Sequence, residues 1–208
     1  MINKDKLLLL NKIGIEPDED TIQKLNIWYE TFVQYNSHTN LMSRGDIEKI
    51  FEKHVFDSLS INLWQNFKNC NKILDVGTGG GFPSVILSIF FKDKKIIAND
   101  SRIKKINFIK EIKEKLELDN LSIVYSRIEE VEPLGVELVV SRAVGKIIDI
   151  YELSKKHLAK NGKFLIYKSK TVEDEILLFK KKYKNVNFEI IPYKLPLEEN
   201  YDRSLVIC

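Results

Sequence analysis

The stretch KILDVGTGGGFPS, residues 72–84, decides the fold class of this chain. A largely apolar run suited to a buried strand leads into a glycine-rich turn at 77–81, and Pro83 suits the first turn of a helix. Glycines in such a turn permit positive φ and let a ligand approach the bare backbone. Asp100 ends the next apolar run, about one strand–helix unit further on, and this context predicts a nucleoside-binding turn.

The chain after residue 71 repeats this alternation of short apolar runs and helical stretches. The first runs are continuously apolar, as strands buried on both faces of a parallel sheet are. Alternating strands and helices imply right-handed crossovers, and so an α/β fold with a Rossmann-type sheet. The last two strand candidates follow each other without a long helix, which predicts an antiparallel hairpin at the edge. The later candidates are KIIAND (95–100), LSIVY (121–125), ELVVS (137–141), KFLIY (163–167), FEIIPY (188–193) and SLVIC (204–208).

The preceding part of the chain has helical spacing. We therefore predict a helical N-terminal extension at 1–66, packed on a sheet domain at 67–208. Apolar residues recur every three or four positions after Asp20-Thr21, which is a plausible N-cap. The polar segment YNSHTNLMSRGD (35–46) is expected to connect this helix to a second amphipathic helix, capped by Asp46.

Composition excludes several classes of protein. The chain has 208 residues, 44% hydrophobic and 30% charged, which is typical of a soluble globular protein. Two cysteines cannot form a disulfide framework and fit a reducing cytoplasm. The longest apolar run, VILSIFF (85–91), is too short to span a membrane. We therefore expect a cytoplasmic protein without a membrane anchor, and a monomer.

The balance of charge is less decisive. The net charge of +3 comes from 33 basic and 30 acidic side chains, which neither indicates nor excludes a nucleic-acid partner. Lysine is the usual cation here, so each arginine raises the question whether its position needs a planar, bidentate group in place of a point charge. The five arginines are Arg44, Arg102, Arg127, Arg142 and Arg203.

The type of nucleoside follows from the residues around the turn. A dinucleotide fingerprint counted from Gly77 would place the large Phe82 at its third small position, which argues against a dinucleotide site. The sequence also lacks the G-K-[ST] element of a nucleoside triphosphate site. Asp75, directly before the turn, would repel a pyrophosphate but attract a cation. S-adenosylmethionine carries a sulfonium, an ammonium and one ribose, whose hydroxyls can donate hydrogen bonds to the Asp100 carboxylate. We predict this cofactor; the alternative is a turn that only reverses the chain.

The chain resembles the bacterial small-subunit (16S) rRNA guanine-N7 methyltransferases, also called the glucose-inhibited division protein B family, from about residue 26 to 206. The most specific elements are His54 and Ser141-Arg142-Ala143, which generic methyltransferases lack. Ser169 and Gly80 depart from the family pattern, which usually has Gly and often has Pro at these positions. The remaining shared motifs are Asn40-Leu41 with Ser43, Asp57-Ser58, DVGTGGGFP (75–83), Asp100-Ser101, Ser126 to Glu129, and Tyr167-Lys168.

The resemblance implies S-adenosylmethionine contacts at Gly77, Phe82, Ile128, Glu129 and Arg142; the turn itself adds Gly79 and Asp100. Glu129 follows the third strand, where it can accept a hydrogen bond from the adenine amino group while Ile128 covers the ring. Alternatively, Glu129 only begins a solvated helix. Arg142 ends the fourth strand, and its alternative role is to pair with a structural carboxylate.

The reaction class also follows from what is absent. An exocyclic amine acceptor usually comes with an N/D-P-P-Y/F motif, which 141–144 lacks, and Cys70 and Cys208 are poorly placed to attack a pyrimidine. Guanine N7 loses no proton on attack, so it fits a site without a base and agrees with the resemblance. Arg142 and Lys168 end adjacent strand candidates and are predicted to grip guanine O6 or a phosphate, with Arg127 and His54 completing the substrate side.

An unpaired loop of 16S rRNA, free or in the small subunit, is the expected partner. Two basic patches are candidate contacts for this RNA: Lys104-Lys105 with Lys110 and Lys113, and KKKYK (180–184). Alternatively, these patches are only solvated faces. The three histidines lack metal-ligand spacing, so no metal is predicted, and His157 is expected at the surface. The open alternatives are a methyltransferase for another RNA or a small molecule, and a non-catalytic module that binds S-adenosylmethionine or a nucleotide.

Overall fold

A computed structural model describes residues 2–39, 41–142, 144–169, 172–197 and 201–208. Its centre is a sheet whose described strands run in the order β3-β2-β1-β4-β5-β7-β6. Strands β1 to β5 are parallel, whereas β7 runs antiparallel to both β5 and β6. The strands are β1 Lys72–Val76, β2 Lys95–Asp100, β3 Leu121–Tyr125, β4 Val136–Arg142, β5 Leu158–Ser169, β6 Glu189–Lys194 and β7 Asp202–Ile207.

The predicted Rossmann-type fold is thus confirmed, including the final hairpin. Within this hairpin, β7 lies between β5 and β6, so β6 forms the edge of the sheet. The sheet is buried on both faces, as its continuous apolar runs predict. Successive residues point to opposite faces, so Ile73 and Ile96 join one apolar core while Leu74 and Ile97 join the other.

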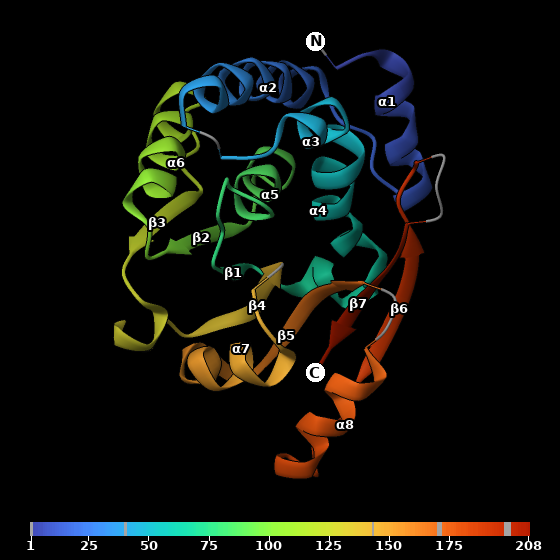
Figure 1. Ribbon diagram of the computed structural model, residues 1–208, viewed down its shortest axis with the longest axis vertical. Coiled ribbons are helices and arrows are strands. Elements are labelled where there is room, and N and C mark those ends of the chain that lie inside the picture. Colours follow the sequence, from blue (N-terminus) through green and yellow to red (C-terminus); the bar gives the residue numbers. More distant parts are fainter. Residues whose placement is uncertain (1, 40, 143, 170–171, 198–200) are drawn as a thin grey trace.

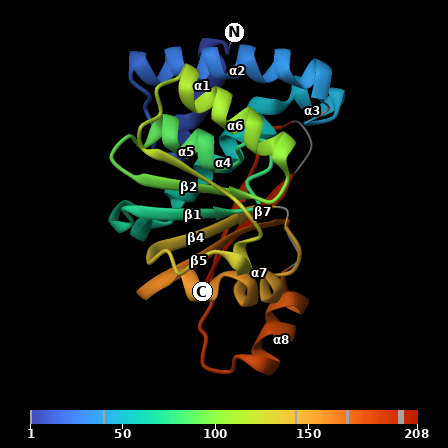
Figure 2. The ribbon, with the colours of Figure 1, turned by 90° about the vertical axis from the view of Figure 1, so that its left-hand side faces the viewer.

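Helices cover both faces of the sheet (Figure 2). Helix α5 (Ser84–Phe90) and helix α6 (Ile103–Lys115) lie on one face. Helix α7 (Ile147–Ser154) and helix α8 (Glu173–Lys182) lie on the other. The N-terminal part of the chain adds a further layer over α5 and α6, with the long helix α2 across the top of Figure 1. Because β1 to β4 run parallel, their carboxyl ends meet at one edge of the sheet.

The N-terminal helices are less regular than their spacing predicts. After helix α2, the expected second helix is a series of short elements that includes a π-helical turn at Phe51–Phe56, which carries His54. Such turns are frequent at functional sites. The elements are α1 (Lys4–Leu8), a 3₁₀ turn (Leu9–Ile13), α2 (Glu19–Thr39), α3 (Arg44–Glu48), the π turn, α4 (Asp57–Leu59) and 3₁₀ turns at Ser60–Leu63 and Gln65–Asn69.

Both predicted helix caps lie a few residues away from their true positions. The side chain of Asp18, rather than Asp20, accepts a hydrogen bond from the Thr21 backbone N–H at 2.8 Å. Similarly, Ser43 caps α3 by accepting from the N–H of Asp46 at 3.3 Å. Asp20 and Asp46 instead lie in the first turns, where acidic side chains favour the helix dipole.

The segment at 35–46 was expected to be a connection, but α2 continues through its first part to Thr39. Ser37 and Thr39 donate their hydroxyl hydrogens back to carbonyls of the helix, so these polar residues fit within it. Asn36 then closes the turn, because its amide both donates to the Met42 carbonyl, at 3.0 Å, and accepts from the Met42 N–H, at 2.7 Å.

The N-terminal helices share an apolar core with the sheet. Trp28 and Phe32 of α2 and Phe56 before α4 belong to the same buried cluster as Ile73 of β1 and Ile109 of α6. The N-terminal helices and the sheet therefore share one apolar cluster, while the predicted division of the chain near residue 66 stays a prediction.

Candidate functional site

The glycine-rich turn joins β1 to α5 in the conformation that the sequence predicts. The N–H groups of Gly77 and Thr78 both donate to the Asn99 carbonyl at 2.9 Å, which ties the turn to β2. Gly77 has a φ of 73°, and a Cβ atom there would lie 2.5 Å from Val144 Cγ2. Gly79 has a φ of 59°, yet a Cβ there would have only the Gly77 carbonyl within 4.0 Å. A side chain at position 79 would therefore enter open space above the turn.

Asp75 lies beneath this turn and not in it. Its side chain is fully buried, and one carboxylate oxygen accepts from the Ser84 N–H at 3.0 Å, at the start of α5. Among the described residues, the other oxygen has no hydrogen-bond partner. Burial raises the pKa of Asp75 to about 6, although hydrogen bonds from Thr78 and Ser84 oppose that rise. The expected attraction for a cation would therefore act from below the turn, without direct exposure of the carboxylate.

A cavity of about 300 Å³ opens above the carboxyl ends of β1, β2 and β3. Four of the predicted cofactor residues line it together: Gly77, Asp100, Ile128 and Glu129. The structure thus brings together, from three loops, residues up to 52 positions apart in the sequence. Val144 and Arg127 also line the cavity.

Asp100 is held by its own chain in this cavity. Its carboxylate accepts from the backbone N–H of Gly79 at 3.0 Å and from that of Arg102 at 2.9 Å. The Arg102 guanidinium also contacts both oxygens, with Nε at 3.2 Å and Nη2 at 3.4 Å. Asp100 therefore links the glycine turn to the loop that follows β2.

Ile128 and Glu129 lie in a 3₁₀ turn (Ile128–Glu130) after β3. The carbonyl of Ile128 lies 3.0 Å from His157 Nε2, and the carbonyl of Glu129 accepts from Lys156 Nζ at 2.7 Å. The prediction that His157 lies at the surface is wrong, because its side chain is fully buried and burial lowers its pKa. His157 and Lys156, which follow α7, thus hold the turn that carries two predicted cofactor residues.

Phe82 has a different environment from the other predicted cofactor residues. Its ring is buried, with centroids of Trp28 and Phe32 both at 5.6 Å and that of His54 at 4.9 Å. The guanidinium of Arg142 lies 5.0 Å from the centre of the Phe82 ring. The side chain of Phe82 therefore fastens the glycine turn to the N-terminal helices.

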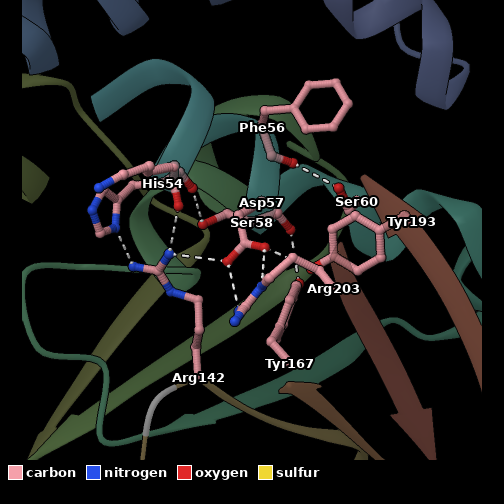
Figure 3. Close-up of polar contacts among 10 residues, drawn as sticks. His54, Phe56, Asp57, Ser58, Ser60, Arg142, Tyr167, Tyr193 and Arg203 are labelled. Carbon is pink, nitrogen blue, oxygen red and sulfur yellow. Dashed lines mark hydrogen bonds and ion pairs between the residues drawn. The ribbon is translucent and has the colours of Figure 1, made fainter. Parts of the chain in front are cut away.

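Arg142 ends β4 and is surrounded by groups of the N-terminal part (Figure 3). Its Nη1 donates to Asp57 Oδ2 and to the Lys53 carbonyl, both at 3.1 Å. Its Nη2 lies 2.7 Å from His54 Nδ1, which must accept because a guanidinium has no acceptor. Burial, together with the charge of Arg142, lowers the pKa of His54 to about 3, so this imidazole is neutral at physiological pH.

Asp57 is the centre of this network. Arg203 of β7 donates to both of its oxygens, from Nε at 3.0 Å and from Nη2 at 3.1 Å, and the Tyr193 hydroxyl of β6 donates at 2.6 Å. Burial alone would raise the pKa of Asp57, but Arg142, Arg203 and Tyr193 together lower it below its ordinary value. The carboxylate thus joins α4 to β4, β6 and β7, and Arg142 has the structural partner that the sequence analysis considered as an alternative.

Lys168 lies near the end of β5, next to β4, as predicted. Its ammonium group forms an ion pair with Glu175 of α8 at 2.8 Å and donates to the Gly145 carbonyl at 2.9 Å. Glu175 also accepts from the N–H of Ile147, at the start of α7. Lys168 therefore connects the loop after β4 to two helices on the far face of the sheet.

The predictions missed Asp57, Tyr193 and Arg203 as parts of one network. The scarcity of arginine was the available signal: Arg102, Arg142 and Arg203 each contact a buried carboxylate. The side chain of Arg44 lies outside the described part of the structure.

Further features concern the predicted surfaces and absences. Lys105, assigned to a basic patch, donates to the Leu41 carbonyl at 3.0 Å and is only partly exposed, whereas Lys104 and Lys110 are exposed.

In the described residues, no group of three or more His, Cys, Asp or Glu side chains is arranged to hold a metal ion. Across the same residues, no helix combines the length and apolarity needed to cross a bilayer.

Comparison with known proteins places this chain in a family. The model of the GidB family, rRNA small subunit methyltransferase G, matches residues 21–205. The chain belongs to this family. It is 37% identical over 207 residues to the ribosomal RNA small subunit methyltransferase G of Fusobacterium nucleatum, covering 95% of this chain and 86% of that protein. It is 34% identical over 172 residues to the protein of that name from Lachnoclostridium phytofermentans, covering 80% and 71%. The resemblance predicted from the motifs is confirmed.

Solved structures support the fold assignment. An O-methyltransferase from Bacillus cereus, in complex with SAH, matches with a TM-score of 0.59 over 97% of this chain and 95% of that chain, at 12% identity. A precorrin-6y C5,15-methyltransferase from Geobacter metallireducens matches with a TM-score of 0.51 over 65% of this chain and 78% of that chain, at 14% identity. At such identities the likeness concerns the methyltransferase fold alone.

Proposed function

We propose that this member of the GidB family transfers a methyl group from S-adenosylmethionine to N7 of a guanine in small-subunit (16S) rRNA. The observation that carries the proposal is the cavity that gathers Gly77, Asp100, Ile128 and Glu129. One carboxylate there suits a pair of ribose hydroxyls, another suits an adenine amino group, and Ile128 offers an apolar cover. The family's name supports rRNA of the small subunit as the substrate.

The chemistry of these residues fits the proposed cofactor. Bound S-adenosylmethionine would supply an electrophilic methyl group on a sulfonium. The chain would hold it through Gly77 and Gly79 of the turn, through Asp100, and through Ile128 and Glu129. Asp75 would add negative potential from beneath the turn, and Phe82 and Arg142 would border the site from the side of the N-terminal helices.

The residues near Arg142 support an acceptor that needs no base. The lone pair of His54 Nδ1 is engaged by Arg142, and both oxygens of Asp57 accept from arginines. Guanine N7 carries a free in-plane lone pair and releases no proton when it is methylated. The enzyme would act chiefly by alignment of donor and acceptor. Arg142 and Lys168 are proposed on the substrate side, where Arg142 would also orient the guanine.

The setting of the reaction is part of the proposal. We propose that the chain acts in the cytoplasm as a monomer, on 16S rRNA or the small ribosomal subunit. An unpaired guanine is the proposed target, because N7 lies in a deep, narrow groove in paired RNA.

The test uses small subunits and naked 16S rRNA from cells that lack the gene, with S-adenosylmethionine labelled in its methyl group. We expect label in the RNA and one new N7-methylguanosine, mapped by primer extension after chemical cleavage. Asp100→Ala should lose cofactor binding and label together, because ribose hydroxyls would lose their acceptor. Cofactor binding without methyl transfer to either substrate would refute the proposal and favour a non-catalytic module.

A further inference from the structure

The carboxylate of Asp100 has no acceptor position left for a ligand in this structure. A carboxylate offers about four acceptor positions. Gly79 N–H, Arg102 N–H, Arg102 Nε and Arg102 Nη2 fill them, at distances from 2.9 to 3.4 Å. Two hydroxyls of a ribose can donate to Asp100 only if two of these donors leave.

The guanidinium of Arg102 is the pair of donors that can leave. The two backbone N–H groups are fixed by the turns that contain them, whereas the side chain of Arg102 is 65% exposed. Arg102 therefore lies where the ribose hydroxyls would donate to Asp100, and its side chain has to swing outwards when they do.

The space outside Asp100 contains further exposed groups. Asp100 and Tyr125 are directly paired in register at the ends of β2 and β3. Arg102 and Arg127 each follow two residues later, so the two arginines leave neighbouring strand ends. Tyr125 is 54% exposed and the side chain of Arg127 is 70% exposed.

A second hollow, of about 490 Å³, lies in this region and is lined by Arg102, Lys104 and Tyr125 among others. It shares Ser101 and Arg102 with the cofactor cavity. We use the term arginine rim for Arg102, Lys104, Tyr125 and Arg127. The arginine rim thus borders the candidate cofactor site directly.

We propose that the arginine rim binds unpaired RNA next to the target guanine, and that Arg102 couples this binding to the cofactor. This inference rests on the proposed function. With the cofactor absent, Arg102 is held by Asp100; with the cofactor bound, its guanidinium is released to the rim. RNA then binds more tightly to the loaded enzyme than to the empty one.

The chemistry of the arginine rim fits a single strand. Guanidinium forks bind phosphate oxygens in a bidentate manner, and an exposed aromatic ring stacks on an unpaired base. Glu129 lies near Arg127, with 3.8 Å between Oε1 and Nη1, and offsets part of the positive charge of the arginine rim. An adenine amino group that engages Glu129 would weaken this pair as well, so both arginines gain freedom on loading.

The test measures two affinities that do not depend on turnover. Binding of S-adenosylhomocysteine is measured by calorimetry, and binding of a fluorescent single-stranded RNA is measured by anisotropy, at fixed salt, with and without S-adenosylhomocysteine. For the wild type we expect the RNA to bind about fivefold or more tightly in the presence of S-adenosylhomocysteine, a factor within the usual range of coupling between sites.

The decisive variant is Arg102→Ala, whose two effects should have opposite signs. S-adenosylhomocysteine should bind as tightly as to the wild type or more tightly, because a competitor for Asp100 is gone. RNA should bind more weakly, and its response to S-adenosylhomocysteine should vanish. Tyr125→Ala should weaken RNA binding about fivefold or more, through loss of stacking, while the coupling remains.

Lys95→Ala is the matched control, because Lys95 is an exposed cation at the other end of β2, on the opposite edge of the sheet. It removes the same charge and should leave all these affinities unchanged. Two results would overturn the proposed release of Arg102 from Asp100. One is weaker binding of S-adenosylhomocysteine by Arg102→Ala than by the wild type. The other is equal RNA affinity of the wild type with and without S-adenosylhomocysteine. RNA binding that survives both Arg102→Ala and Tyr125→Ala overturns the arginine rim as the RNA surface. In either case, intact methyl transfer by the wild type would leave the proposed function standing.

Discussion

Replacing Asp75 by asparagine should stabilise the protein at neutral pH. Burial raises the pKa of Asp75 from 3.8 to about 6. The native state therefore binds more protons than the unfolded state between these two values, and stability falls as the pH rises through that window. At about 1.36 kcal/mol per pKa unit, the ionised carboxylate costs the native state about 3 kcal/mol above pH 7.

Asparagine keeps an acceptor for the Ser84 N–H and carries no charge at any pH. We expect Asp75→Asn to gain about 3 kcal/mol in the free energy of unfolding at pH 8 and roughly half of that at pH 5. Urea denaturation of both proteins at pH 5, 6, 7 and 8 measures this difference, and contributions from other titrating groups cancel in the comparison. A gain that does not depend on pH, or a loss at pH 8, would refute the reasoning.

The same variant tests the role of Asp75 in binding. If its charge attracts the cationic cofactor from below the turn, Asp75→Asn should bind S-adenosylmethionine about tenfold more weakly, or about 1.4 kcal/mol, by calorimetry. A variant that is more stable and binds the cofactor normally would show that the charge of Asp75 contributes neither to stability nor to binding.

Three other substitutions test the turn, the network and the adenine side. Gly79→Ala should abolish cofactor binding, whereas the matched variant Gly135→Ala should not. Both glycines have positive φ and room for a Cβ atom, with only a backbone oxygen at 4.0 Å near Gly79 and nothing within 4 Å at Gly135, so each variant should lose about 1–2 kcal/mol of stability. Equal cofactor binding by the two variants in calorimetry would disprove the role of the turn. Asp57→Ala leaves Arg142 and Arg203 without a counter-charge and should cost about 3–5 kcal/mol; a loss in urea denaturation well below 1 kcal/mol would contradict the network. His157→Ala removes the hydrogen bond to Ile128, so the affinity for S-adenosylmethionine should fall about fivefold, and an unchanged dissociation constant would make His157 a packing residue only.

The strands and the glycine turn were predictable because their signals are local. Apolar runs such as 95–100 and 137–141 need burial on both faces wherever they lie, and only glycine tolerates the conformation at Gly77. The order of the last strands was not predictable, because FEIIPY and SLVIC form a hairpin whether β6 or β7 lies at the edge.

The parts that sequence reasoning missed depend on tertiary contacts. His157 stands among lysines, and only the fold shows that it turns inwards to the Ile128 carbonyl. The helix starts at Asp18 and Ser43 were missed because several acidic and hydroxyl residues nearby were equally suitable caps. Asp57 gathers partners from strands 85 to 146 residues later, a distance at which no pattern of spacing carries information.

The position of β7 has a consequence for the order in which the protein matures. Arg203 leaves the ribosome 146 residues after Asp57, the carboxylate that it completes. The edge strand β6 pairs with β7 and so has to wait for it, although β6 is synthesised first. During translation, the N-terminal helices can dock on the early strands, but Asp57 gains its contacts with Arg203 only when β7 inserts. We therefore expect β7 and the Asp57 region to gain protection in a single kinetic phase when folding is followed by pulse-labelled hydrogen exchange.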